Sequence, residues 1–273
     1  MSVEHNHSSQ FSWKKLGIVL TYLFFIATTI TLLAFSSGHQ SQLKCWKMEV
    51  VIEGTEEGKG LITEEEVMQI CNSANKGVLG KTSEQIDIPN LRRSLLINPY
   101  IQQAQVYQKL DGRCKIYIET RTPIARVLDS AGTASYIDQN GFVMPLKDGF
   151  SADVPFFVGA FRAPMLTQSI QEDGKATDRQ KEILEFSQVI AENETWNAQV
   201  DHFYWMSHHG WVMIPRVGRN IIRFDDTKFF KKKMENLFVF YSKAMPHVDL
   251  DSYDTLDTRF INQIVGIKRN IAI

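Results

Sequence analysis

The sequence carries almost no excess of charge of either sign. Lys and Arg together number 30 and Asp and Glu number 31, which leaves a formal net charge of −1 over 273 residues. A general nucleic-acid binder normally carries a basic patch large enough to tilt this balance. The composition therefore argues against nucleic acid as a partner, and near-neutrality indicates no other partner class.

Cysteine is scarce as well, with only Cys45, Cys71 and Cys114 in the chain. Their separations match neither a zinc ribbon nor a CxxC redox motif, so buried or incidental thiols are favoured over a metal or redox centre. If all three face an oxidising compartment, one of them has no partner within a monomer. Cys71 with Cys114 is the pair that we single out for a test.

Motifs for catalysis are missing too, since no HExxH, GxSxG or P-loop sequence occurs. His202, His208 and His209 could suggest a metal, but the last two lie in a predicted hairpin turn, where exposed polar residues are expected. Asp225 and Asp226 are better explained as charges at the start of a helix than as an acid–base pair. The sequence favours a protein that is not an enzyme and needs no cofactor or metal.

One long hydrophobic run is present: Leu16 to Phe35 contains no charged side chain. As a helix it spans about 30 Å, the thickness of a bilayer core. Lys14 and Lys15 precede it, and the positive-inside tendency then places residues 1–15 in the cytoplasm and the bulk of the chain on the other side. A cleaved signal peptide is the alternative, but the run exceeds the roughly 7–15 residues of a signal's apolar region. We expect an uncleaved transmembrane helix over residues 16–35.

Residues 46–120 predict a small α+β domain. A strand over residues 46–53 precedes a helix that begins with a capping box at Thr63, and Pro99 forbids continuation of a second short helix. Two alternating segments then flank an Asp-Gly pair at positions 111–112, which is typical of a tight hairpin. This order, strand-helix-helix-strand-strand, is shared by POTRA domains.

Residues 121–270 predict a mostly antiparallel β domain with two packed helices. The hinge into this domain is placed at Arg121, Pro123 and Ala125, because the proline restricts its predecessor to extended conformations. Capping and helical spacing predict one helix from Thr177 and another from Thr227.

Two short strands, Leu256 to Phe260 and Ile264 to Ile267, are predicted to close the chain. Whichever of them lies at the sheet edge presents unpaired N–H and C=O groups, which form a template for another chain unless they are covered. Replacing Val265 by Pro is expected to remove a donor from this ladder.

Several motifs occur in a fixed order along the chain. They are Asn98-Pro99-Tyr100-Ile101, Arg121-Thr122-Pro123-Ile124-Ala125, Tyr136-Ile137-Asp138-Gln139-Asn140-Gly141, Pro155 to Gly159, and Leu256-Asp257-Thr258-Arg259-Phe260 with Asn262-Gln263. Together with the anchor and the POTRA-like order, this set resembles the FtsQ/DivIB family of bacterial cell-division proteins. The segment Ile214 to Gly218 and the pair Asn262-Gln263 look most like versions from Bacteroidota.

The resemblance implies a non-enzymatic scaffold in the inner membrane, with its bulk in the periplasm and enriched at the division septum. In the family, the terminal strands bind an FtsB/DivIC-type coiled-coil protein, which pairs with FtsL, and the POTRA domain contacts other division proteins. Carried over to this chain, the partner-binding strands comprise Phe260, Ile264, Val265, Gly266 and Ile267. An aromatic residue that some members carry just after the last strand is replaced here by basic residues, so no single anchor residue is assigned.

Two other functions stay open at this point. A POTRA-bearing component of protein export or outer-membrane assembly would need a run of POTRA repeats, and no periodic repeat occurs. A membrane-anchored enzyme lacks a catalytic constellation. The expected partners are therefore FtsB/DivIC-like and FtsL-like division proteins, together with the lipid bilayer around the anchor.

Overall fold

The computed structural model describes residues 13–40, 43–53, 60–75, 77–160, 168–170, 176–243 and 247–269. Contacts within the chain define two compact units. The first comprises Met1–Val51, Met68–Ser94 and Gln105–Tyr117, and the second comprises Ile52–Val67, Leu95–Ala104 and Ile118–Ile273.

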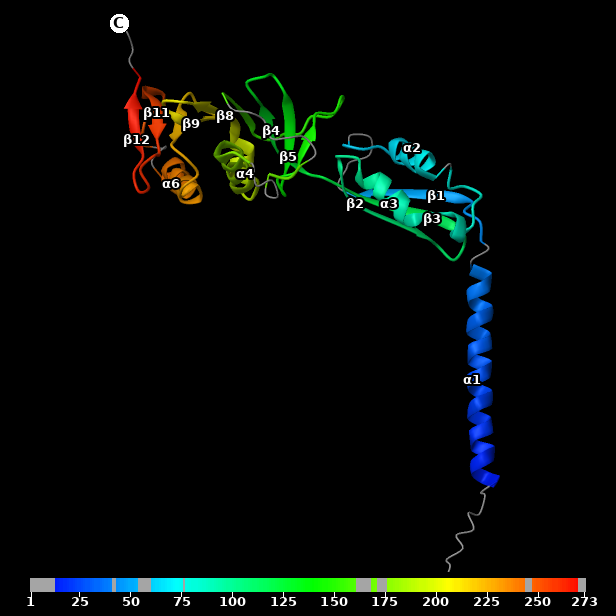
Figure 1. Ribbon diagram of the computed structural model, residues 1–273. Helices are drawn as coiled ribbons and strands as arrows, with labels where there is room; N and C mark the ends of the chain where they lie inside the picture. The colour runs from blue at the N-terminus through cyan, green and yellow to red at the C-terminus, as the bar shows by residue number, and fades with distance from the viewer. Residues whose placement is uncertain are drawn as a thin grey trace, which may run out of the picture. The chain divides into compact units, whose positions relative to one another are not determined.

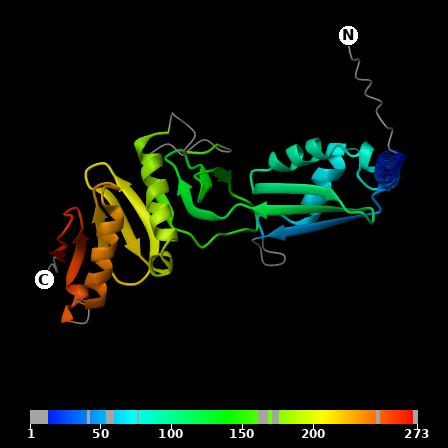
Figure 2. The same ribbon diagram turned by 90° about the horizontal axis from the view of Figure 1, so that it is seen from below.

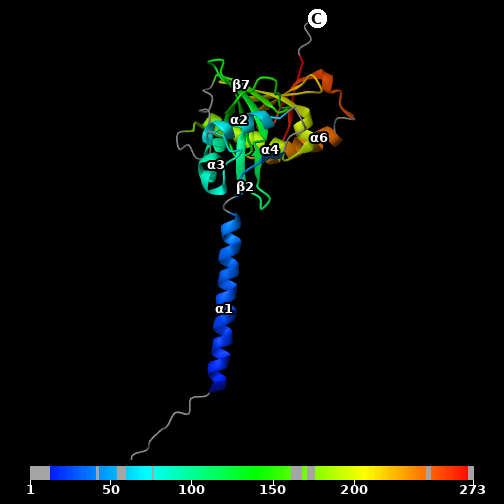
Figure 3. The same cartoon turned by 90° about the vertical axis from the view of Figure 1, so that its right-hand side faces the viewer.

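Helix α1 (Trp13–Gln40) is one uninterrupted helix that includes the long apolar run (Figure 3). Its described side chains are those of residues 17–32. Within this helix, Thr21 and Thr28 donate their hydroxyls to carbonyls three and four residues earlier, which satisfies these polar groups without outside partners. Over the described residues, no helix is both long enough and apolar enough to cross a membrane. The tail 1–12 and the side chains of Leu16 and Phe35 lie outside the described residues, and the anchor stays a prediction.

A three-stranded sheet contains β1 (Lys47–Glu53), β2 (Ile101–Gln108) and β3 (Arg113–Thr120) in the order β1-β3-β2. Helices α2 (Glu64–Asn75) and α3 (Ile88–Leu96) lie on one face of this sheet (Figures 1 and 2). The predicted strand-helix-helix-strand-strand order is confirmed. A short 3-10 turn before α3, Ser83–Gln85, was not predicted.

Local sequence signals set the boundaries of these elements. The Thr63 hydroxyl accepts from the Glu66 N–H and the Glu66 carboxylate accepts from the Thr63 N–H, which is the predicted capping box. Gly112 turns the β2–β3 hairpin at a φ of 84°, a conformation that glycine adopts without strain. In β3 every second residue is buried, from Cys114 to Thr120, so one face of the strand packs beneath the helices.

The second sheet has nine strands in the order β12-β11-β10-β9-β8-β7-β4-β5-β6. Their bounds are β4 (Pro123–Leu128), β5 (Ala134–Asp138), β6 (Val143–Pro145), β7 (Phe156–Gly159), β8 (Val200–Met206), β9 (Gly210–Pro215), β10 (Ile221–Phe224), β11 (Tyr253–Asp257) and β12 (Val265–Lys268). The pairs β4/β7, β7/β8 and β10/β11 are parallel and the other neighbours are antiparallel. A mostly antiparallel sheet was predicted, and this is confirmed.

Helices α4 (Asp178–Ala191) and α6 (Phe230–Lys243) cross the same face of this sheet (Figures 1 and 2). Phe186 of α4 lies at the centre of the core, with its ring centroid 4.4 Å from that of Phe230 and 5.2 Å from that of Phe203. These three rings are almost fully buried. Both helices were predicted, whereas the short α5 (Glu194–Gln199) was not, although Asn193 caps it by accepting from the Trp196 N–H.

The last strands begin and end at other residues than predicted. Strand β11 stops at Asp257, because the Asp257 carboxylate accepts from the Arg259 N–H and the Thr258 N–H donates to the Arg223 carbonyl of β10. The chain therefore turns away from its predicted path. Phe260 and Ile264 lie in the connection between β11 and β12, and their assignment to strands was wrong.

Candidate partner-binding edge

Strand β12 is the outermost strand of the nine-stranded sheet, and Figure 1 draws it in red beside β11. It pairs with β11 through Asp257 opposite Val265, Leu256 opposite Gly266 and Thr255 opposite Ile267. Its other side has no neighbouring strand in the described sheet. The opposite edge, β6, contains only three residues and ends in proline, which cannot donate to a ladder. The sequence left open which of the last two strands lies at the sheet edge, and in the structure it is β12.

The direction of the main-chain groups follows from one hydrogen bond beyond the strand. The Arg269 N–H donates to the Ser252 carbonyl at 2.9 Å, so the backbone of residue 269 faces the β11 side. Backbone groups alternate sides along a strand, and the irregularity in this pair lies on β11, between Tyr253 and Thr255. Val265 therefore bonds toward β11, while Gly266 and Lys268 direct their N–H and C=O groups toward the open side.

This geometry corrects the test expected from the sequence. Replacing Val265 by Pro removes a donor that holds β12 in its own sheet, and not one that another chain could use. The donors available to another chain belong to Gly266 and Lys268.

Gly266 is required here by close contact and not by a special backbone angle. A Cβ atom at this position would lie 2.6 Å from two ring carbons of Tyr253, the residue of β11 that pairs with Lys268. The ring of Tyr253 thus covers the position where a side chain would stand. Gly266 is exposed and Ile267 is 45% exposed, so the strand is bare at its outer end.

A hollow of about 580 Å³ lies beside the connection that leads into β12. Phe229 and Phe260, each 54% exposed, belong to its lining together with Ile261. Phe229 has a φ of 59°, which is uncommon for a bulky residue and marks a backbone held by its surroundings. Because of this residue, α6 begins at Phe230, later than the predicted start at Thr227. The sequence carried no signal for this hollow.

Two ion pairs fix the walls of this hollow. Arg259 binds Asp257 through both guanidinium branches, at 2.9 Å for Nε to Oδ1 and 2.7 Å for Nη2 to Oδ2. Burial alone would raise the pKa of Asp257, but the bonds from Arg259 outweigh it and the pKa lies below its usual value. Lys233, which is buried, forms an ion pair with Asp225 through its Nζ. Burial alone would raise the pKa of Asp225, but the bond from Lys233 contributes to a pKa below the usual value. Asp225 thus pairs with Lys233. The first turn of α6 contains no acidic residue, so the prediction that Asp225 and Asp226 are charges at the start of a helix was wrong.

The predicted hinge residues all lie in the second unit. The Arg121 N–H donates to the Tyr100 carbonyl, Arg121 Nη1 lies 2.7 Å from Asp138 Oδ2, and the guanidinium carbon lies 3.6 Å from the ring centre of Phe142. Pro123 pairs with Asp138 across β4 and β5, and Ala125 is fully buried. These contacts describe one state of the segment, and its movement as a hinge stays a prediction.

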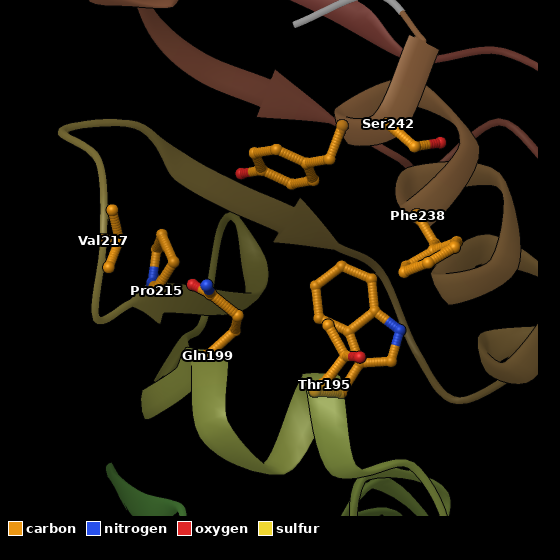
Figure 4. Close-up of a pocket in the computed structure, with 8 residues that line it drawn as sticks. Thr195, Gln199, Pro215, Val217, Phe238 and Ser242 are labelled. Atoms are coloured by element: carbon orange, nitrogen blue, oxygen red, sulfur yellow. The ribbon is translucent and has the colours of Figure 1, made fainter.

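A second cavity of about 270 Å³ lies between α5, α6 and the end of β9 (Figure 4). Its lining comprises Thr195, Trp196, Gln199, Pro215, Val217, Phe238, Tyr241 and Ser242. Burial raises the pKa of the Tyr241 hydroxyl. The lining contains no carboxylate, imidazole or amine, so this cavity offers apolar contact rather than acid–base chemistry. Sequence patterns missed it because α5 was not predicted.

Among the described residues, His202, His208 and His209 do not form a metal centre with acidic residues. His208 and His209 lie in the turn between β8 and β9, as expected, and His202 Nδ1 lies 2.8 Å from its neighbour Asp201. Within the described part of the chain, no group of three or more His, Cys, Asp or Glu side chains is arranged to hold a metal ion.

Comparison with known proteins agrees with this architecture. The family model described as "FtsQ/DivIB, C-terminal related" matches residues 122–267, and the model described as "POTRA-like domain" matches residues 43–119. A relative named cell division protein FtsQ, from the Bacteroidota species Rhodothermus marinus, is 25% identical over 180 residues. That match covers 62% of this chain and 60% of the relative, which is less than two thirds of the relative's length. The first family model covers more than half of the sequence, and the chain therefore belongs to the FtsQ/DivIB family.

Proposed function

We propose that this protein is a scaffold of the bacterial division machinery that captures an FtsB/DivIC-type protein, itself paired with an FtsL-type protein, through the open edge of β12. Membership of a cell-division family supports the process. The single observation that supports the mode of binding is an edge strand whose Gly266 and Lys268 face outward. An added strand gains affinity from main-chain hydrogen bonds of this kind and specificity from pockets beside them.

The hollow next to β12 supplies such a pocket. A peptide strand that lies along β12 and continues toward its N-terminal end reaches Phe229 and Phe260, whose exposed rings offer apolar contact. Lys228 and Lys268 add positive charge near this path, whereas Lys233 and Arg259 are neutralised by their own carboxylate partners. The proposed partner segment is therefore extended, with an apolar side chain for the hollow and carboxylates nearby.

We place the protein in the inner membrane with residues 1–15 in the cytoplasm and the bulk in the periplasm, enriched at the septum. The uncharged run from Leu16 to Phe35 and the lysines before it support this topology. Residues 46–120 form the proposed POTRA-like domain, which contacts other division proteins, and residues 121–270 form the proposed β domain. The protein has no catalytic role in this proposal and needs no cofactor.

The decisive experiment compares three variants at the edge strand. Lys268→Pro removes an outward donor, Lys268→Ala removes only the charge, and Val265→Pro removes a donor to β11. Leaving a buried acceptor of the partner unsatisfied costs about 1–3 kcal/mol, so Lys268→Pro is expected to weaken binding about tenfold or more. Lys268→Ala should bind within about threefold of the wild type, because one exposed charge contributes little.

Binding is measured by surface immobilisation of the full chain in detergent, with the FtsB/DivIC-type protein of the same organism in solution. Denaturant midpoints are measured in parallel, and Val265→Pro is expected to lower both stability and binding. Equal affinities for wild type and Lys268→Pro, with both folded, would rule out strand addition at β12. In cells, depletion of the protein is expected to give unseparated filaments, and normal septation would refute the division role itself.

A further inference from the structure

The segment that follows α1 lies against the start of β3. The Trp46 N–H donates to the Gly112 carbonyl, and the indole Nε1 donates to the Asp111 carbonyl at 3.0 Å. A Cβ atom at Gly112 would come within 2.9 Å of the Lys44 carbonyl oxygen, so the two backbones are in close contact. Cys45 sits in the middle of this segment, and Cys114 is the second residue of β3.

The two thiols meet in the interior. Cys45 is completely buried and Cys114 is 3% exposed. Burial, and after it the neighbouring thiol of Cys45, raises the pKa of Cys114 to about 12. The Cys45 Sγ itself donates to the Lys47 carbonyl at 3.5 Å. Cys71, on α2, is also fully buried, and burial raises the pKa of its thiol to about 11. All three thiols are free in this structure.

Backbone contacts hold Cys45 on both sides. Its N–H donates to the Lys81 carbonyl at 2.8 Å, and its own carbonyl accepts from the Gly80 N–H at 2.7 Å. The position of the thiol opposite β3 is thus set by the main chain and not by a free loop. The bond from the Trp46 N–H to the Gly112 carbonyl keeps the main chains next to Cys45 and Cys114 close together, as a disulfide requires.

We propose that Cys45 and Cys114 form a disulfide bond when the chain matures in an oxidising compartment. One S–S bond forms, the two thiols lose two protons and two electrons, and the electrons reduce the disulfide of a thiol–disulfide oxidant to two thiols. This inference rests on the proposed location of residues 43 onward outside the cytoplasm. It replaces the pair Cys71 and Cys114, which the sequence had suggested for a test.

The bond is structural and not a switch. A thiolate is the attacking species in disulfide exchange; both thiols are buried, and the raised pKa of Cys114 leaves few thiolates at that residue. The bond therefore forms before the domain closes over both residues, and it is slow to reduce afterwards. It fastens the residues that leave α1 to the central strand of the three-stranded sheet, so a pull on α1 does not peel β1 from β3.

The test uses the full chain in detergent, refolded in a buffer of oxidised and reduced glutathione. Free thiols are then alkylated, and the digested protein is analysed by mass spectrometry without reduction. A peptide that joins Cys45 to Cys114 is expected in the wild type and in Cys71→Ala, the matched control. Alkylation of all three cysteines in the wild type, or a bond between Cys71 and Cys114, would overturn the proposal.

Thermal unfolding provides the second readout. A bond between Cys45 and Cys114 closes a long loop and restricts the unfolded chain. A strong reductant is therefore expected to lower the melting temperature of the wild type and of Cys71→Ala by about 5 °C or more. The reductant should leave Cys114→Ala unchanged, and an equal effect of the reductant on all three proteins would count against the bond.

Alkylation in intact cells separates the two proposals. Protected Cys45 and Cys114 with a linked peptide support both of them. A bond that forms in the glutathione buffer, while the thiols stay free in cells, supports the pairing and refutes the proposed location.

Discussion

The contact between Arg121 and Asp138 gives the sharpest prediction about stability. The Asp138 carboxylate is fully buried, and Arg121 is only 15% exposed. Besides the guanidinium, the carboxylate accepts from the N–H groups of Asn140 and Phe142, both at 2.8 Å, which forms the β5–β6 turn. Replacing Arg121 by Met keeps most of the apolar stem of the side chain and removes the charge. The carboxylate then stays buried with two neutral donors in place of a cation.

The magnitude follows from this environment. Removing one partner of a buried ion pair costs about 3–5 kcal/mol, because an uncompensated charge remains inside. Here two backbone donors remain, so we expect Arg121→Met to lower the free energy of unfolding by about 3 kcal/mol. The double variant Arg121→Met with Asp138→Asn should recover part of this loss, since an amide tolerates burial better than an unpaired carboxylate.

The assay is urea denaturation of the full chain in detergent, followed by tryptophan fluorescence, because Trp196, Trp205 and Trp211 all lie in the nine-stranded sheet unit. The control is Lys231→Met, which breaks an ion pair with Glu192 in which both side chains are more than 60% exposed. A pair of that kind contributes at most about 1 kcal/mol. If Arg121→Met shifts the midpoint no more than Lys231→Met does, the buried pair does not stabilise this unit and the reasoning fails.

Three further predictions concern the same unit. Phe186→Ala is expected to lower the free energy of unfolding by about 3–5 kcal/mol, because the Phe186 ring fills the centre of the aromatic core. Phe238 is 46% exposed, so Phe238→Ala should lower it by less than half of that in the same urea assay. The folded-state pKa values of Asp225 and Asp257 are lowered, so the two carboxylates stabilise the fold above about pH 4, and this contribution is lost as the pH falls through the folded values. The urea midpoint of Asp257→Asn should therefore change less between pH 7 and pH 3 than that of the wild type. An equal change in the two proteins would contradict this assignment. Gly266→Ala should displace β12 from β11 through the clash with Tyr253, seen as faster amide hydrogen exchange at residues 265–268, and the double variant with Tyr253→Ala should restore protection.

Short-range signals in the sequence were sufficient for most elements. The capping boxes at Thr63 and Thr177, the glycines at positions 112 and 141 and the helical stripe around Phe186 each act within a few residues, so the sequence alone predicts them. The order of strands and helices along the chain in the three-stranded sheet domain follows from the same signals. What these patterns predict is the type of each element and its approximate limits.

Long-range partners were not accessible in this way. The parallel pairing of β10 with β11 joins segments more than thirty residues apart, and β4 pairs with β7 across another insertion. No local pattern encodes which strand a segment finds. The same limit applies to the contact of Arg121 with Asp138 and to the proximity of Cys45 and Cys114, since the sequence had singled out Cys71 with Cys114 for a test.

The sequence predicted that a last strand could form the candidate site, but not which of its main-chain groups face outward. Alternation predicted two last strands, either of which could lie at the sheet edge, and in the structure the edge strand is β12. Which residues bond outward depends on the last inward bond, from Arg269 to Ser252, and on the irregularity of β11. Both are outcomes of packing, so the sequence could not indicate that the Val265 N–H bonds toward β11.

An open edge is also a hazard, and the features of β12 limit what can add to it. The strand has four residues and ends at Lys268, with Arg269 next, so a second copy of β12 that paired in parallel and in register would bring like charges together. An acidic segment meets the opposite situation and gains from the same charges. The exposed backbone at Gly266 allows another strand to approach closely, while the neighbouring positive charges disfavour basic chains at this edge. For the proposed function, this combination favours capture of an acidic partner strand over parallel self-association through β12.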